Sequence, residues 1–345
     1  MTVVTGVSGS GKSTLARDVL LANAAAQVSA RNRRKAAPAL VGVDRMDGWQ
    51  GITRVLEVDQ TPIGKTPRSC PATYVGYWDA IRRLFADTSE ARIRGWSAGR
   101  FSFNTGGGRC EACEGQGQQT IEMSFLPDVK VLCDVCGGRR FNRETLDVQL
   151  RGRNIGDVLA MDVDEAVGYF AAHPAIAHPL QLLQDVGLGY LTLGQPSPTL
   201  SGGEAQRIKL VTELAKVRTR GADDDPRVTR ARARALAAGK VLPPGPHTLY
   251  VFDEPTVGLH MADVEKLIRV LHRLVDAGNT LVVVEHNLDI WAEADWIVDL
   301  GPDGGAGGGR IVAAGTPAEL AGDGDTHTAR ALRAFLGSRP ATHGT

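Results

Sequence analysis

The chain lacks the features of a membrane or secreted protein. Its 345 residues contain no uninterrupted apolar stretch of the roughly 18–20 residues that a membrane span needs. No charged N-terminal region precedes an apolar run, so a signal peptide is not indicated. We therefore expect a cytoplasmic protein with reduced thiols and no membrane partner.

The chain also lacks net charge. Its 39 Lys and Arg residues balance 39 Asp and Glu residues, so any nucleic-acid surface must be a local patch. One short stretch is rich in arginine and poor in acids. These arginines could contact a phosphate backbone or form an ordinary solvated face, and charge alone does not decide between the two. They are Arg82, Arg83, Arg92, Arg94, Arg100 and Arg109.

Four of the five cysteines have the spacing of a metal site. Cys110 and Cys113 form one C-x₂-C pair, and Cys133 and Cys136 form a second pair after nineteen intervening residues. This spacing is typical of a Cys₄ zinc site, in which four thiolates complete the tetrahedron and make the zinc structural. Buried free cysteines are the less specific alternative. Cys70 is left over and is expected to be a plain thiol.

The residues Gly6–Ser13 fit G-x-x-x-x-G-K-[ST], the P-loop pattern. A β-branched run precedes them and a segment without helix breakers follows, which is the required strand–loop–helix context. Glycines let successive backbone N–H groups face one anion, and the helix N-terminus adds its dipole. The sequence therefore predicts ATP binding, with Lys12 on the β/γ-phosphates and Ser13 on Mg²⁺. The candidate nucleotide contacts are Gly6, Ser8, Gly9, Gly11, Lys12, Ser13 and Thr14.

A buried strand, residues 249–254, ends in two carboxylates that complete this site. Asp253 is predicted to hold Mg²⁺, and Glu254 to orient or deprotonate the attacking water. His286 ends the next strand and could sense a γ-phosphate. Gln60 ends the strand 52–60 and is a candidate contact to Mg²⁺ or to the attacking water, although a lone Gln is more often a solvated strand end.

A second candidate anion site begins at Ser201. Ser201, Gly202 and Gly203 precede a helix predicted from Glu204 to Val217, so unpaired N–H groups lie at its positive end. An ordinary helix cap would use the same serine. The complete string Leu-Ser-Gly-Gly-Glu-Ala-Gln-Arg is much rarer than such a cap.

The kind and order of these motifs resemble those of the ATP-binding-cassette family, and this resemblance implies an α/β P-loop ATP-binding-cassette fold with a mixed sheet, a helical signature subdomain and an inserted Cys₄ zinc module. Local patterns also favour one helix over 75–91 and a strand-like run over 141–150. The predicted parts are the first core segment 1–96, the zinc module 97–153, the signature subdomain 154–217, an Arg/Pro-rich insertion 218–246, the second core segment 247–320 and a tail 321–345. The insertion is expected to be a solvated loop.

Within the ATP-binding-cassette family, strings such as Gly99–Asn104, Glu122–Asp128 and Glu285–Asp289 are similar to the C-terminal half of UvrA proteins, the damage-recognition ATPases of bacterial excision repair. The resemblance covers residues 2–320 apart from the insertion. It implies ATP, Mg²⁺ and Zn²⁺ as cofactors, and damaged double-stranded DNA and UvrB as partners of the complete protein.

The resemblance also implies that the Ser201 helix binds the γ-phosphate of an ATP on another cassette. We find one cassette and no internal repeat of the P-loop, so the second cassette is expected from another copy or from an N-terminal half. Two alternatives remain open. The chain could be the ATPase subunit of a membrane transporter, which would have no need of a zinc module, or an inactive remnant of a cassette.

Overall fold

The computed structural model describes residues 1–123, 125, 129–221 and 247–338, and these form two compact units. The first unit comprises Met1–Asp59 and Thr219–Thr345, and the second comprises Gln60–Arg218. Residues 60–96, which the sequence analysis grouped with the cassette core, pack within the second unit. Most of the predicted insertion, 222–246, lies outside the described residues.

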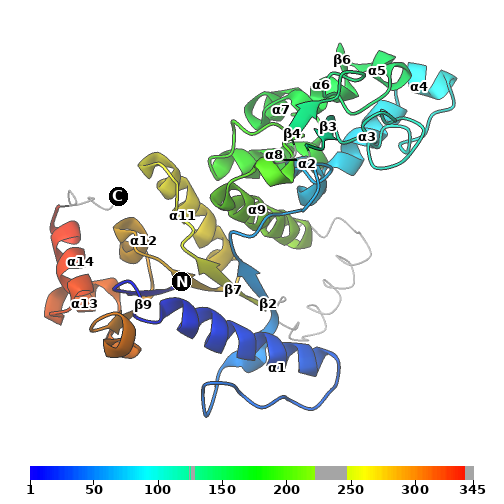
Figure 1. Cartoon of the computed structure of the whole chain (residues 1–345). Coiled ribbons are helices and arrows are strands. Elements are labelled where there is room, and N and C mark those ends of the chain that lie inside the picture. Colours follow the sequence, from blue (N-terminus) through cyan, green and yellow to red (C-terminus); the bar gives the residue numbers. More distant parts are fainter. Residues whose placement is uncertain (124, 126–128, 222–246, 339–345) are drawn as a thin grey trace, which may run out of the picture. The chain divides into compact units, whose positions relative to one another are not determined.

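A six-stranded sheet organises the first unit, in the order β10-β9-β1-β8-β7-β2 (Figure 1). All neighbouring strands are parallel except the pair β9 and β10. The predicted mixed sheet is thereby confirmed. The strands are β1 (Thr2–Gly6), β2 (Ile52–Val58), β7 (His247–Asp253), β8 (Thr280–Val284), β9 (Trp296–Gly301) and β10 (Arg310–Gly315).

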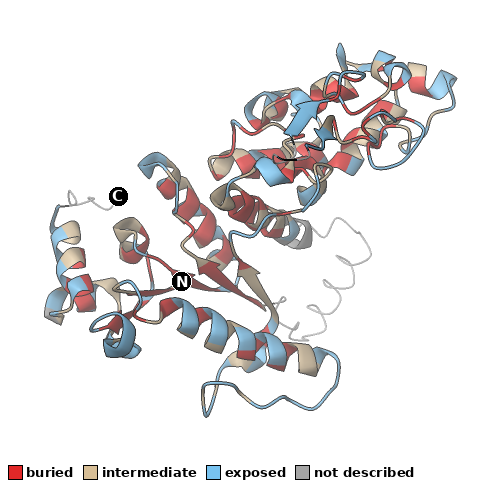
Figure 2. Ribbon diagram, in the orientation of Figure 1, coloured by how far each residue is buried: buried red, intermediate tan, exposed pale blue. Residues whose placement is uncertain are grey.

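The register of the sheet positions the candidate site. Val4 of β1 and Asp253 of β7 both pair with Val284 of β8. Because parallel strands have their carboxyl ends at one edge, the P-loop, Glu254 and His286 follow three adjacent strands at that edge. The three strands β1, β7 and β8 are mostly buried (Figure 2), because helices cover a parallel sheet on both faces.

The P-loop runs directly into a helix. Its first part, Thr14–Leu21, has π-helical hydrogen bonding, and it continues as α1 (Ala22–Asn32). The amphipathic helix α11 (Met261–Asp276) buries Val264, Leu267, Leu271 and Leu274 at helical spacing. The remaining elements of this unit are η2 (Trp49–Gly51), α12 (Leu288–Ala292), η4 (Gly305–Gly307), α13 (Pro317–Asp323) and α14 (His327–Ser338).

The second unit is mostly helical around two short hairpins. Its N-terminal part contains α2 (Pro71–Val75), α3 (Trp78–Ala86), α4 (Ser89–Ile93), β3 (Gln118–Ile121) and β4 (Val129–Leu132). It continues with α5 (Arg143–Asp147), β5 (Gln149–Leu150), β6 (Arg153–Asn154), α6 (Ile155–Ala160), α7 (Val163–Tyr169), α8 (Pro174–Asp185), η3 (Ser197–Thr199) and α9 (Gly202–Gly221).

Two local predictions in this unit are wrong. The helix expected over 75–91 is divided, because Gly76 adopts a left-handed φ of 98° and Thr88 caps a new helix by accepting a hydrogen bond from Ala91. The run 141–150 forms helix α5 in its middle and a strand only at Gln149–Leu150, because the side chain of Asn142 accepts a hydrogen bond from the Thr145 amide and starts the helix. In both cases a cap overrides the periodicity of the neighbouring residues.

The few aromatic residues of the chain concentrate in the core of the second unit. Phe103 lies 5.6 Å from Trp78 and 6.1 Å from Phe141, ring centroid to ring centroid, and Phe85 lies 5.6 Å from Phe101. The four phenylalanines are at most 1% exposed. Aromatic rings bury large apolar areas, so a small number of them supplies much of this core.

Candidate functional site

The P-loop has the conformation that its glycines predict. Gly6, Gly9 and Gly11 have φ values of 135°, 75° and 94°, which side-chain-bearing residues rarely adopt. The buried Lys12 turns back into the loop, and its Nζ donates to the carbonyl oxygens of Gly6 (3.2 Å) and Val7 (2.9 Å). The loop thus positions its one cation at the concave side, where an anion would replace these carbonyl partners.

A glycine-rich loop after β9 supports the P-loop. The Gly305 amide donates to the Gly9 carbonyl (3.1 Å), and the Gly309 amide donates to the Ser10 carbonyl (3.0 Å). A Cβ at Gly304 would lie 2.5 Å from the Ser8 carbonyl oxygen, so the two backbones approach closely only because of this glycine. No sequence motif predicts a role for this segment.

Two predicted catalytic residues of this unit lie together. The His286 Nε2 is 3.7 Å from the Glu254 Oε1, and both side chains are roughly half exposed. Glu254 has a φ of 45°, in the left-handed region that non-glycine residues seldom occupy. Asp253 precedes it at the strand end, 4.0 Å from the guanidinium of Arg17. At the start of the helix, Ser13 and Thr14 are exposed, as contacts to a ligand require.

Charge around Lys12 is balanced by acids. Burial lowers the pKa of the Lys12 ammonium, while the charges of Glu254, Asp253 and Asp299 act to raise that pKa. The three carboxylates therefore favour the charged form of a lysine that burial would otherwise tend to neutralise. The structure thus brings Lys12, Asp253 and Glu254 into one electrostatic cluster, as predicted.

Two further elements of the predicted ATP site, Gln60 and the helix start at Ser201, lie in the second unit. Ser201 and Glu204 form a reciprocal cap: the Ser201 amide donates to the Glu204 carboxylate (2.7 Å), and the Glu204 amide donates to the Ser201 hydroxyl (3.3 Å). Gln60 lies against the same helix start, since a Cβ at Gly202 would be 3.0 Å from the Gln60 side chain. Gln60, Ser201 and Gly202 are therefore neighbours, which their sequence separation did not reveal.

Tyr190 extends this cap. Its hydroxyl donates to the Glu204 Oε1 (2.6 Å), and burial together with this bond raises the pKa of Tyr190 to about 12. Burial acts to raise the pKa of Glu204, but the bonds from Tyr190 and Ser201 and the charge of Arg207 lower it below its usual value. Glu204 thus stabilises the helix start as a carboxylate, in addition to the capping role of Ser201.

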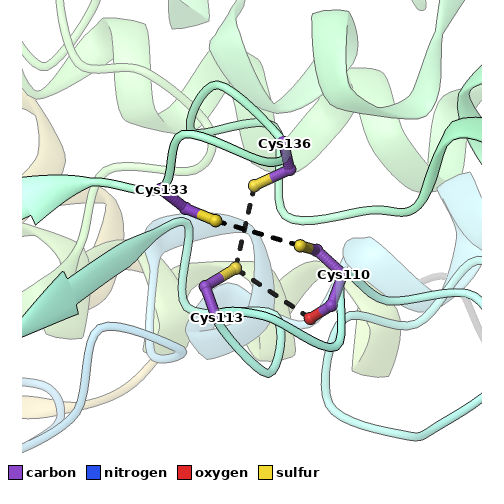
Figure 3. A group of neighbouring side chains, drawn as sticks. All are labelled: Cys110, Cys113, Cys133 and Cys136. Carbon is purple, nitrogen blue, oxygen red and sulfur yellow. Dashed lines mark hydrogen bonds between the residues drawn. The ribbon is translucent and has the colours of Figure 1, made fainter.

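The four predicted zinc ligands form a compact cluster (Figure 3). Their sulfur atoms all lie within 4.8 Å of one another, with 3.9 Å between Cys110 and Cys133 and 3.7 Å between Cys113 and Cys136. A tetrahedral zinc with Zn–S bonds of about 2.3 Å requires S···S separations of about 3.8 Å. The residues therefore fit a Zn²⁺ ion bound by four thiolates.

Buried groups surround the cysteine cluster. All four cysteines are buried, and the Cys110 amide donates to the Arg140 carbonyl (2.9 Å). The Arg140 guanidinium is buried as well and donates to the carbonyls of Pro67 (3.0 Å) and Gly194 (2.7 Å). Arg140 thereby links the zinc module to the segments 61–71 and 187–200 of its unit. Sequence reasoning missed this role, and no local pattern signals it.

Most of the arginines in the arginine-rich stretch have acidic partners. Arg100 pairs with Glu144 (2.7 Å) and Arg94 with Glu90 (2.5 Å). The guanidinium groups of Arg94 and Arg100 also lie over the Trp96 ring. The further pairs are Arg82–Asp79, Arg92–Asp87 and Arg109–Glu111. These contacts favour the interpretation as a solvated, ion-paired face over that of a free phosphate-binding patch.

Comparison with known proteins shows extensive similarity to UvrA. The chain is 54% identical over 334 residues to UvrABC system protein A of Aquifex aeolicus, which is 96% of this chain and 33% of that protein. It is 57% identical over 320 residues to the Thermus thermophilus protein of the same name, which is 92% of this chain and 30% of that protein. No family model matches the sequence.

A solved structure is similar in fold as well as in sequence. The chain matches the crystal structure of UvrA2 from Deinococcus radiodurans with a TM-score of 0.78 and 50% identity, covering 97% of this chain and 37% of that one. The chain spans about one third of the length of the curated relatives that it matches. The resemblance to UvrA found in the sequence motifs is thereby confirmed.

Proposed function

Because the chain is a homologue of one segment of UvrA, we propose that it is an ATP-binding and ATP-hydrolysing subunit, or part of one, that acts on damaged double-stranded DNA in excision repair. The observation that carries the proposal is the cluster of Lys12, Asp253, Glu254 and His286 at one edge of the first unit's sheet. Membrane transport is less well supported, because a zinc-binding cysteine cluster has no role in that activity. Among the described residues, no helix is long and apolar enough to span a bilayer.

In the proposed reaction, the P-loop amides and Lys12 bind the ATP phosphates. Ser13 and Asp253, with Gln60, hold Mg²⁺, which neutralises phosphate charge when bound. Glu254 orients the attacking water or accepts its proton, and His286 lies beside Glu254 to contact the γ-phosphate. Ser201, Gly202 and Gly203 supply the anion-binding helix start for ATP on a second cassette.

The proposed partners are a second cassette, from another copy or from an N-terminal half, and UvrB in the complete protein. The proposed location is the cytoplasm. The cysteine cluster is proposed to bind structural zinc within a module that takes part in DNA handling. These proposals are supported by the similarity to UvrA and by the fit of the cysteine sulfurs to zinc.

The proposal is tested by comparing ATP hydrolysis of the wild type with Glu254→Gln. General-base catalysis contributes about 10²–10⁴-fold, so we expect the variant to lose at least about 100-fold in kcat. ATP affinity, measured with a fluorescent ATP analogue, should stay within about threefold of wild type because the phosphate-binding loop is unchanged. Both proteins should be assayed alone and with a separately expressed N-terminal UvrA cassette.

If the wild type is no more active than Glu254→Gln, even with the added cassette, the result would support the inactive-remnant alternative instead.

The DNA function is tested by gel-shift titration of damaged and undamaged duplexes of one sequence. We expect tighter binding to the damaged duplex and an affinity that falls as salt rises. Equal binding to both duplexes would contradict damage recognition by this chain.

A further inference from the structure

We propose that Glu285 is a positioning residue that holds Glu254 and His286 in their relative geometry. The proposal rests on the ATPase function proposed above. Glu285 lies between the last residue of β8 and His286, and the sequence analysis assigned it no role. Its side chain is buried, with a residue exposure of 2%.

Both carboxylate oxygens of Glu285 bind backbone groups of the site. Oε1 accepts from the Thr256 amide (2.8 Å) and from the Thr256 hydroxyl. Oε2 accepts from the amides of His286 (2.6 Å) and Asn287 (3.0 Å). A buried carboxylate is stable only when such donors satisfy it, and here the donors come from two different loops.

One of these loops follows β7 and the other follows β8. Thr256 is two residues after Glu254, and the second pair of donors begins at His286 itself. Glu285 therefore joins the loop that carries the proposed general base to the loop that carries the histidine. The Glu254 amide donates to the Val284 carbonyl (2.9 Å), which continues the sheet up to this junction.

The main chain of Glu285 is anchored as well. The indole Nε1 of Trp291, on α12, donates to the Glu285 carbonyl (3.0 Å) in a buried contact. The bond from Trp291 therefore restricts the backbone of Glu285, and with it the position of the Glu285 carboxylate. The carboxylate acts as a fixed acceptor to which the loop after β7 is attached through Thr256.

Such an attachment explains the backbone of Glu254. A left-handed φ of 45° is unfavourable for a residue with a side chain and persists where surrounding contacts determine it. The Val284 carbonyl holds the Glu254 amide, and Glu285 holds Thr256 on the far side of Pro255. The two contacts together determine the conformation of Glu254 and place its carboxylate 3.7 Å from His286.

The test is Glu285→Gln in the full chain. Glutamine keeps the shape of the side chain but has one acceptor oxygen, and its NH₂ group would face amide donors. Either the Thr256 amide or the amides of His286 and Asn287 therefore lose their acceptor. Since small misplacements of catalytic groups cost up to about 100-fold, we expect kcat for ATP to fall by about 10–100-fold. The KM and the affinity for the fluorescent ATP analogue should change by less than about threefold.

Glu319→Gln is a matched control in the same unit. The Glu319 carboxylate also accepts from a threonine amide (2.8 Å) and hydroxyl (2.9 Å), those of Thr316, but it caps α13 away from the site. We expect Glu319→Gln to retain wild-type kcat. Thr256→Ser keeps the hydroxyl bond and should retain most of kcat, whereas Thr256→Val loses it and should show a partial loss.

Hydrogen exchange gives a second measurement that does not depend on hydrolysis. In Glu285→Gln, the amides on the side that loses its acceptor, either Thr256 or both His286 and Asn287, should exchange at least about tenfold faster, while those of β8 stay protected. Unchanged exchange and unchanged kcat in Glu285→Gln would overturn the inference. If the wild type fails to hydrolyse ATP, the proposed function fails, and the exchange result alone decides the role of Glu285.

Discussion

Gly6 shows how a single residue sets the geometry of the candidate site. It ends β1, it has a φ of 135°, and a Cβ built on it would lie 2.0 Å from the carbonyl oxygen of Leu300. Both its conformation and its space exclude a side chain. The absence of a side chain at Gly6 therefore lets the start of the P-loop lie directly against Leu300 of β9.

We predict that Gly6→Ala destabilises the first unit by about 2–4 kcal/mol, from overpacking and an unfavourable backbone. Gly168→Ala is the matched control, because Gly168 is an exposed residue of α7 and a Cβ added to it would meet no other atom within 4 Å. This control should be neutral or more stable by up to about 1 kcal/mol. Urea unfolding measures both, and equal stability of the two variants would contradict the prediction.

At the scale of elements, two short structures hold the second unit's functional parts in place. The first is the pair of cysteine knuckles, whose four sulfurs converge although nineteen residues separate the pairs. The second is the start of α9, where Glu204 binds both Ser201 and Tyr190. Each depends on a few local bonds, so each is open to a simple test.

We expect the purified chain to contain about one zinc ion, measured by plasma mass spectrometry, because four thiolates fill a tetrahedral site. Cys133→Ser should lose the metal, because it removes one of the four ligands. Cys70→Ser is the control: Cys70 is also buried but belongs to no ligand cluster among the described residues, so this variant should keep the zinc. Equal zinc content in the two variants would argue against the site.

The cap of α9 should depend on pH. The lowered pKa of Glu204 means that its carboxylate contributes stability above the unfolded pKa near 4.5 and loses this contribution as pH falls through the folded value. Glu204→Gln should therefore lower the thermal midpoint at pH 7 but have a shrinking effect below about pH 4. Glu265→Gln, at an exposed pair on α11, controls for the loss of a surface charge. A difference from wild type that stays constant with pH would contradict the prediction.

In the whole molecule, the P-loop site and the cysteine cluster lie in different units. The proposed ATP-binding residues of the P-loop and the carboxylates lie in the first unit, and the proposed zinc-binding cysteines lie in the second. Each unit has its own core and its own set of helices. ATP and zinc should therefore each stabilise a different unit, since a ligand stabilises the part of the chain that binds it.

Calorimetry of the full chain should show two transitions. ATP with Mg²⁺ at about 100 times its Kd should stabilise one of them by about 2.7 kcal/mol, and Lys12→Ala should remove this effect. Chelation of zinc should lower the other transition. A single transition that both ligands shift equally would mean that the units unfold together.

Short motifs in the sequence were enough to propose the candidate site residues of this protein. The P-loop, the two cysteine pairs, the carboxylates after β7 and the helix start at Ser201 are all readable because short-range spacing dictates where neighbouring backbone and side-chain atoms point. For the same reason four strands of the sheet were predicted: the one before Gly6, 52–60, 249–254 and the one that His286 follows. The two local errors, at 75–91 and 141–150, arose where a glycine or an asparagine cap outweighed periodicity.

The tertiary structure alone decided which distant residues meet. Glu285 binds Thr256 from 29 residues away, Arg140 binds Pro67 from 73 residues away, and Gln60 lies against Gly202. Ion pairs between the arginines of the basic stretch and acidic residues also become visible only in the folded structure. These contacts depend on how the chain returns to itself, and a buried polar group can find its partner only after that return. Composition, net charge and local spacing therefore do not predict these long-range contacts.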